Sequence, residues 1–204
     1  MKSTFPKNLK GILFDMDGVL IDSFFAWLGL VNQTAKYFGF TPIKEDTFRQ
    51  VYGQSTHEDV QAFFPGQTTE VIDNFYETHF FDHKDGIHTF EDAKEVFNKL
   101  ENLNFQIAVV TNTVNNLAKG ILEYAKLYPK VLIGGDDVAH GKPEPDMLFL
   151  ACEKLSINPS QVIMIGDSKF DKESAEKAGI YFIGINGLES EKTINSLSDL
   201  MSLF

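Results

Sequence analysis

The chain has one cysteine, Cys152, so it forms no intrachain disulfide and no cysteine-rich zinc site. This scarcity is typical of proteins that work in a reducing compartment. No stretch approaches the roughly 18 apolar residues that span a bilayer. Residues 1–10 hold no long apolar run of the kind found in a secretory signal. We therefore expect a cytoplasmic protein that does not enter membranes.

Positive charge is also scarce. The chain has 18 Lys and Arg residues against 29 Asp and Glu residues, which gives a formal net charge of −11 over 204 residues. A surface of this sign repels the phosphates of nucleic acids and of anionic membranes, so neither is an expected partner. A small phosphorylated substrate stays compatible with this charge if a metal cation offsets it at the site. The sequence gives no indication of the oligomeric state.

Five short segments are apolar at successive residues, as are strands that a parallel sheet buries on both faces. They are residues 11–15, 106–111, 131–133, 161–165 and 181–185. Helical patterns separate most of them and indicate βαβ units. These patterns cover residues 91–103, 114–124, 145–155 and 170–178. The sequence thus predicts an α/β fold with a Rossmann-like parallel sheet and helices on both faces.

The interval between the first two strands, about ninety residues, is far longer than a crossover needs. It contains helical patterns at residues 24–38, 58–64 and 69–81 and no convincing strand before residue 81. The simplest interpretation is a helical cap, residues 21–85, inserted into an α/β core of residues 1–20 and 86–204.

Polar residues follow three of the expected strands. Asp15 and Asp17 follow the first, Thr111 and Asn112 the second, and Asp167 a later one. Because parallel sheets bind ligands at the carboxyl ends of their strands, we expect these groups to converge. Three carboxylates in one small volume repel each other unless a cation joins them, and Mg²⁺ prefers such oxygen ligands. The cluster favours phosphoryl transfer, in which a protein positions groups and neutralises charge.

Four motifs occur in order around these residues. Residues 15–23 (DMDGVLIDS) resemble the first motif of the haloacid dehalogenase superfamily, in the form that its phosphatases use. Thr111-Asn112 resembles the second motif, Lys142 in a GKPEPD segment the third, and residues 166–171 (GDSKFD) the fourth. Each motif alone also fits a turn, a strand end or a helix cap. Together they resemble the phosphoglycolate phosphatase and β-phosphoglucomutase-like branch, in which a helical cap follows the first motif.

The resemblance implies a mechanism. Asp15 is the expected nucleophile, which attacks phosphorus and forms an aspartyl-phosphate. Asp17 is expected to protonate the leaving oxygen and then to deprotonate the water that hydrolyses the intermediate. Lys142 and Thr111 complete the catalytic set, with the ammonium neutralising the nucleophile and a phosphoryl oxygen. The predicted enzyme is a phosphoric monoester hydrolase that acts on a small phosphorylated metabolite.

The resemblance also implies a binding set. Met16, Asn112 and Thr113 are the expected substrate-binding residues. Asp15, the backbone carbonyl of Asp17, and Asp167 are the expected ligands of Mg²⁺. Asp171 matches the second acid of the fourth motif and has a supporting role, in which it orients a metal-bound water or Lys142.

Two departures bear on the alternatives. Mutase relatives carry a His where this chain has Trp27, and an Arg where it has Thr56. Both changes count against a sugar-phosphate mutase and leave hydrolysis intact. A non-catalytic member of the fold that binds a phosphorylated ligand or a protein is the other alternative. The acid at Asp17 argues against it, because a pure binder does not need that group.

Two further features have two interpretations each. His79 and His83 are four residues apart, a spacing that permits zinc, although a solvated hinge between domains fits better. Arg49 is the only arginine and lies near residues 53–57, which resemble a cap loop that selects substrates. It fits either anion recognition or an exposed surface position.

Overall fold

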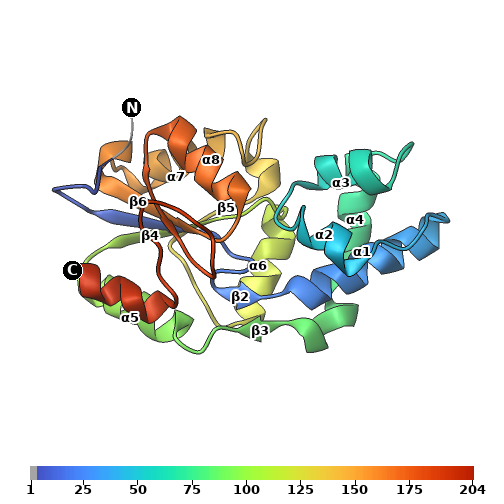
Figure 1. Ribbon diagram of the computed structural model, residues 1–204, viewed down its shortest axis with the longest axis horizontal. Coiled ribbons are helices and arrows are strands. Elements are labelled where there is room, and N and C mark those ends of the chain that lie inside the picture. The colour runs from blue at the N-terminus through green and yellow to red at the C-terminus, as the bar shows by residue number, and fades with distance from the viewer. Residues whose placement is uncertain (1–3) are drawn as a thin grey trace.

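A five-stranded parallel sheet forms the centre of the computed structural model, which describes residues 4–204 (Figure 1). The strand order is β5-β4-β1-β6-β7, so the first strand lies in the middle. This sheet confirms the predicted Rossmann-like α/β fold, and each strand begins within one residue of its predicted start. Residues 1–3 of the predicted core lie outside the described residues. The strands are β1 (Gly11–Phe14), β4 (Gln106–Val110), β5 (Val131–Ile133), β6 (Val162–Gly166) and β7 (Tyr181–Gly184).

The sheet is covered on both faces because successive strand side chains point to opposite sides. On one face, Phe14 and Val109 belong to a core shared with α5, α6 and the carboxyl-terminal helix. On the other, Leu13 and Met164 pack with α7 and α8, which lie above the strands in Figure 1. The helices after residue 90 are α5 (Ala93–Asn102), α6 (Asn115–Tyr124), α7 (Asp146–Leu155) and α8 (Lys169–Ala178), with 3₁₀ helices η2 (Gly135–Asp137), η3 (Pro159–Gln161) and η4 (Leu197–Leu203).

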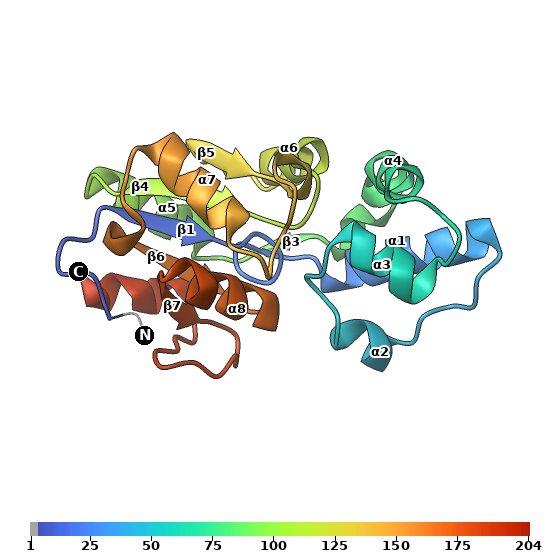
Figure 2. The ribbon, with the colours of Figure 1, turned by 90° about the horizontal axis from the view of Figure 1, so that it is seen from above.

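The helices of the predicted cap lie beside the sheet rather than on it (Figure 2). Local sequence signals set their ends. Ser55 and Glu58 form a capping box at the start of α3, and Thr68 caps α4. Phenylalanines fill much of the interior between these helices. The helices are α1 (Phe24–Phe38), α2 (Glu45–Arg49), α3 (Thr56–Phe63) and α4 (Thr69–His79), followed by the 3₁₀ helix η1 (Phe80–Gly86).

The chain enters and leaves the cap through two adjacent segments. The short strands β2 (Ile21–Asp22) and β3 (His88–Thr89) pair antiparallel at this point. Gly86 then touches the start of α1, where an added Cβ would lie 2.8 Å from the backbone nitrogen of Ala26. A side chain here would push the two linkers apart. Within the described residues 4–204, no helix has both the length and the apolar character needed to cross a membrane.

Candidate active site

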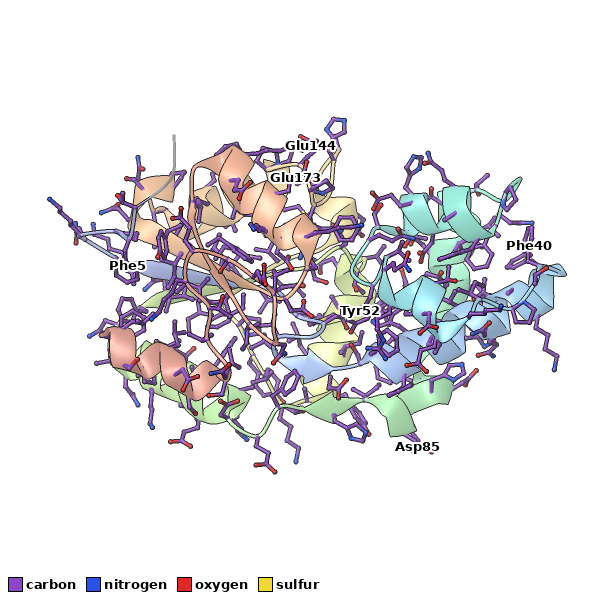
Figure 3. All side chains as sticks on the ribbon, in the orientation of Figure 1. Phe5, Phe40, Tyr52, Asp85, Glu144 and Glu173 are labelled. Atoms are coloured by element: carbon purple, nitrogen blue, oxygen red, sulfur yellow. The ribbon has the colours of Figure 1, made fainter. Side chains whose placement is uncertain are left out.

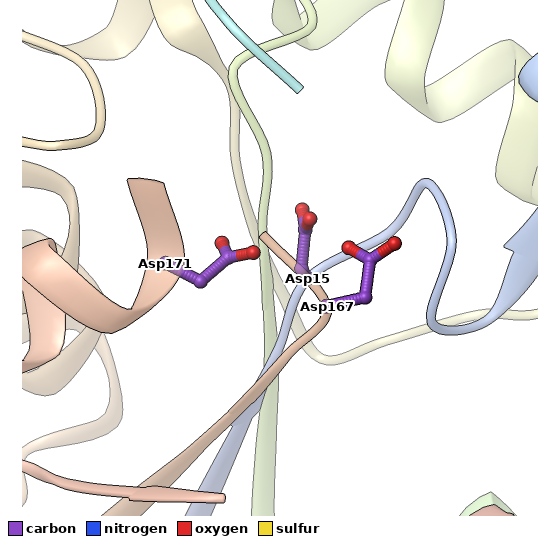
Figure 4. A group of neighbouring side chains, drawn as sticks. All are labelled: Asp15, Asp167 and Asp171. Carbon is purple, nitrogen blue, oxygen red and sulfur yellow. The ribbon is translucent and has the colours of Figure 1, made fainter. Parts of the chain in front are cut away.

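The three polar segments meet at one edge of the sheet, beyond the carboxyl ends of the strands. Asp15 follows β1, Thr111 follows β4, and Asp167 follows β6. Figure 4 shows Asp15 and Asp167 side by side, with Asp171 of α8 turned toward them. One carboxylate oxygen from each of these three residues lies within 4.8 Å of the other two. The strand order brings these distant residues together because β1 lies between β4 and β6.

Lys142 is the cation of this cluster. Its Nζ donates to Asp15 Oδ1 at 2.8 Å, to Asp171 Oδ1 at 2.6 Å and to the carbonyl of Val110 at 3.0 Å. All three charged side chains are at most 5% exposed. Asp171 is held in turn by Ser168, whose hydroxyl donates to Oδ2 at 2.5 Å. The lysine and Asp15 therefore have fixed relative positions before any ligand arrives.

Burial and the neighbouring charges together shift the pKa values of these groups. Burial, followed by the nearby Asp171 carboxylate, raises the pKa of Asp15, and Lys142 opposes that rise. Burial acts to lower the pKa of Lys142, but Asp15 and Asp171 outweigh it and raise the pKa above its usual value. The ammonium therefore stays charged. Burial and Asp171 also raise the pKa of Asp167 to about 8.

The acidic cluster fits a hard cation. Three carboxylates share a small buried volume with one ammonium, which leaves negative charge without a partner. Gly18 makes room for Asp167, because a Cβ at Gly18 would overlap the Asp167 carboxylate. Asp15, Asp167 and Asp171 are the one group of three potential metal-ligating side chains found among residues 4–204. Oxygen donors of this kind suit Mg²⁺ or a similar metal ion.

Asp17 faces the cap instead of the acidic cluster. Its Oδ1 accepts hydrogen bonds from the Ser23 hydroxyl and, at 2.9 Å, from Trp27 Nε1. Its Oδ2 accepts from Thr113 Oγ1 at 3.2 Å. Burial raises the pKa of Asp17, and these three donors oppose that rise. The group is thus fixed in position and easier to protonate than an exposed aspartate.

Two other expected binding residues have partners inside the protein. The backbone nitrogen of Met16 donates to Asp15 Oδ1 at 2.7 Å. The Nδ2 of Asn112 donates to the carbonyls of Gly53 in the cap and Lys142 in the core, both at 2.9 Å. Its Oδ1 accepts from the backbone nitrogen of Lys142 at 2.8 Å. Asn112 therefore links the cap to the loop that carries the lysine.

A small cavity lies between these loops and the cap. It has a volume of about 40 Å³, which holds only a few waters, so the cap leaves little space over the site. Tyr52, labelled in Figure 3, lies where the cap meets the sheet, and its hydroxyl is 2.9 Å from that of Ser23. The core supplies Asp15, Asp17, Thr111, Asn112 and Thr113 to the lining; the cap supplies Trp27, Phe48, Val51, Tyr52, Gly53, Gln54, Thr56, Asp59 and Tyr76.

The remaining candidates lie away from this cavity. Arg49 pairs with Glu45 at 2.5 Å and is largely exposed. It borders a neighbouring open cleft, whose lining also includes Tyr52 and Asp167. His79 contacts Asp82 and Gln33, and His83 contacts Gln33. Among residues 4–204, neither imidazole belongs to a group of three potential metal-ligating side chains.

Trp27 and Asp59 are among the residues of the cavity wall that the sequence did not predict to be part of the site. Trp27 was weighed only as a departure from the mutases, yet it contacts Asp17 directly. Its alignment with the mutase histidine is the one signal that this position faces the site, and the contact itself depends on the direction in which α1 leaves the core. Asp59 follows Glu58 in the first turn of α3, and acidic residues are common there in exposed helices. Its burial is a tertiary effect.

Comparisons with known proteins agree with the motifs. A family model described as haloacid dehalogenase-like hydrolase matches residues 12–185. The chain is 29% identical to a phosphoglycolate phosphatase of Vibrio cholerae, over 88% of this chain and 85% of that protein. It is 30% identical to a phosphorylated carbohydrates phosphatase of Thermotoga maritima, over 84% of this chain and 82% of that protein. The crystal structure of a hydrolase from Pseudomonas syringae has the same fold, with a TM-score of 0.84, 19% identity, and coverage of 95% and 96% of the two chains.

Proposed function

This chain belongs to the haloacid dehalogenase-like hydrolases, and from that premise we propose that it hydrolyses a small phosphate monoester through an aspartyl-phosphate intermediate, with Mg²⁺ as cofactor. The prediction of an enzyme of this family is confirmed. The substrate, the metal and the residue roles are proposals. One observation carries them: Asp15 and Asp17 line one cavity, and a buried lysine holds the first.

In the first step the Asp15 carboxylate attacks phosphorus, and the bond from phosphorus to the ester oxygen breaks. Asp17 gives its proton to that oxygen, so the alcohol leaves neutral. This step requires a protonated Asp17, and burial favours that form by raising its pKa. Lys142 neutralises charge on Asp15 and on a phosphoryl oxygen, and Thr111 and Met16 supply donors near the same oxygens.

In the second step a water attacks phosphorus, and Asp17 accepts its proton. The bond between Asp15 and phosphorus breaks, which releases phosphate and restores the carboxylate. Asp15, Asp167 and the backbone carbonyl of Asp17 are the proposed ligands of Mg²⁺, and Asp171 orients Lys142. The bound cation supplies positive charge to the phosphoryl oxygens. The closed cap excludes other water.

Transfer to a second sugar hydroxyl is the weaker alternative. Thr56 and Trp27 both line the cavity, at the positions where the sequence analysis found departures from the mutases. No histidine or arginine is among the described residues that line it. The cap therefore offers no imidazole to activate a sugar hydroxyl.

The test is turnover of p-nitrophenyl phosphate with and without Mg²⁺. We expect Asp15→Asn to lose activity by ~10³-fold or more, because the amide is a poor nucleophile. Asp46→Asn, an exposed charge change on α2, is the matched control and keeps the wild-type rate. Mass spectrometry of quenched enzyme should find one phosphoryl group on Asp15. Activity that survives in Asp15→Asn contradicts the mechanism. A folded wild type that turns over no phosphate ester supports a binding protein instead.

A further inference from the structure

The wall that the cap presents to the cavity has a distinctive composition. Its side chains are aromatic or aliphatic, except for Gln54, Thr56 and Asp59. This wall lines the same cavity as Asp15 and Asp17, so it is placed to contact the part of a substrate that lies beyond the phosphoryl group. Its polar groups therefore bear on which leaving alcohol the enzyme accepts.

Asp59 is the charged group of this wall and is only 6% exposed. Its Oδ1 accepts from Gln54 Nε2 at 2.7 Å, and its Oδ2 accepts from the Tyr76 hydroxyl at 2.9 Å. A carboxylate can accept about four hydrogen bonds, so each oxygen retains capacity for another donor. The Nε2 of Gln54 points at Asp59, and its amide oxygen is a further acceptor. The wall thus offers acceptors to a ligand.

No positive side chain balances Asp59 at the cavity. The described residues that line it include no lysine, arginine or histidine. Lys142, on the opposite side, is bound to Asp15 and Asp171. Arg49 pairs with Glu45 and stacks over the Phe24 ring beside the other cleft. A substrate carboxylate would therefore face Asp59 without a cation, and burial makes such a like-charge contact costly.

We propose that the preferred leaving group is a small alcohol that carries a hydrogen-bond donor and no negative charge, with Asp59 and Gln54 as the residues that select it. This inference rests on the proposed function. It excludes phosphorylated hydroxy acids as preferred substrates, including phosphoglycolate, after which the similar Vibrio cholerae protein is named. The specificity arises because unpaired buried polar groups penalise the wrong ligand more strongly than they reward the right one.

Three two-carbon esters of the same skeleton test the proposal. 2-Hydroxyethyl phosphate ends in a hydroxyl, 2-aminoethyl phosphate in an ammonium, and phosphoglycolate in a carboxylate. The kcat/KM values are compared at pH about 8.5, above the pKa of about 7 to which burial raises Asp59. We expect the wild type to favour the hydroxyl and ammonium esters over phosphoglycolate by at least about tenfold. The order of the first two identifies the preferred donor.

Two variants test whether the cap wall of the cavity causes that substrate preference. Asp59→Asn removes the charge and keeps the shape, so kcat/KM for phosphoglycolate should rise about tenfold relative to the other esters. Gln54→Lys supplies the missing cation beside Asp59 and should have the same effect. Asp46→Asn removes an exposed cap charge as the matched control and should keep the wild-type ratios. Thermal unfolding establishes that each variant is folded.

The outcomes separate this inference from the proposed function. Each ester is also measured as an inhibitor of p-nitrophenyl phosphate turnover, so that slow hydrolysis still yields an affinity ratio. A wild type that turns over the chromogenic ester but prefers phosphoglycolate overturns the inference alone. The same holds if neither Asp59→Asn nor Gln54→Lys alters the ratios. Absence of turnover of every ester overturns the proposed function, and the inference with it.

Discussion

At the scale of single residues, the hydrogen bond from Trp27 shows how one side chain fixes the position of another, the carboxyl group of Asp17. Trp27 packs on Phe80 with ring centroids 4.7 Å apart and directs its Nε1 at Asp17 Oδ1. Trp27→Phe keeps an aromatic ring in this place and removes the donor. We expect kcat for p-nitrophenyl phosphate to fall about tenfold with a smaller change in KM, since a less fixed acid transfers its proton less efficiently.

The matched control for Trp27→Phe is Tyr37→Phe. It removes a donor from the same helix at a position that is 70% exposed. This control should retain the wild-type kcat. If Trp27→Phe retains it too, the indole does not position Asp17.

Asp59 predicts a pH dependence of stability. Burial raises its folded-state pKa to about 7 from 3.8, so between these values the folded state holds a proton that the unfolded state has lost. The proton on Asp59 therefore stabilises the folded state fully below about pH 4, and this stabilisation is lost as the pH rises through about 7. Relative to Asp59→Asn, the free energy of unfolding of the wild type should fall by about 1.4 kcal/mol per pH unit in this window.

Urea unfolding at several pH values from 4 to 9, in the presence of a chelator, measures this difference. The comparison between the two proteins cancels the titration of all other groups. A difference that does not change with pH would show that Asp59 stays ionised when folded.

Individual site residues were predictable where the backbone fixes them. Asp15, Thr111 and Asp167 each follow a strand, so the strand order alone brings them together. The contacts of Trp27 and Asp59 depend on how the cap packs, which no local spacing encodes. The Asn112 contact with Gly53 was missed for the same reason.

Among the elements, the loop after β1 shows how one glycine positions the acidic cluster. Gly18 has φ +78°, and an added Cβ would overlap the Asp167 carboxylate. Gly39, which ends α1, also has φ +78° but has open space around it. Gly39→Ala therefore isolates the backbone strain, about 1 kcal/mol. Gly18→Ala adds displacement of Asp167 and should lower both Mg²⁺ affinity and kcat by at least about tenfold.

Calorimetric titration of Mg²⁺ and urea unfolding of both variants separate the two effects. Both variants should lose stability, and only Gly18→Ala should also lose Mg²⁺ affinity. If Gly18→Ala binds Mg²⁺ as tightly as Gly39→Ala, Asp167 is not held against Gly18 in solution.

Elements with strong periodicity were predicted well, and very short ones were not. The buried strands are runs of apolar residues, and these runs identified them. The amphipathic pattern of α1 predicted this helix at its observed bounds. Strands β2 and β3 have two residues each, too few for any alternation to appear. Helix α2 has five residues and one buried side chain, so its pattern is equally short.

At the scale of the molecule, the closed cavity predicts a motion that Trp27 can report. It is the only tryptophan, lies in the cavity wall, and belongs to the cap. A cavity of about 40 Å³ is too small for a phosphate ester with its alcohol, so the cap must move for substrate to enter. Acrylamide should quench Trp27 less when beryllium fluoride and Mg²⁺ are bound than in the free enzyme. Unchanged quenching, with binding established by calorimetry, would argue against this motion.

The side-chain amide of Asn112 spans the boundary between the two parts of the protein. When the cap lifts, the Gly53 carbonyl departs and one amide hydrogen loses its acceptor, although the contacts with Lys142 remain. An incoming phosphoryl oxygen can take that vacancy. The Gly53 carbonyl and the phosphoryl oxygen of the substrate thus compete for the same amide hydrogen of Asn112. One hydrogen bond of this kind stabilises the closed form by only about 1 kcal/mol, so the idle enzyme still opens, and each turnover begins with the release of that contact.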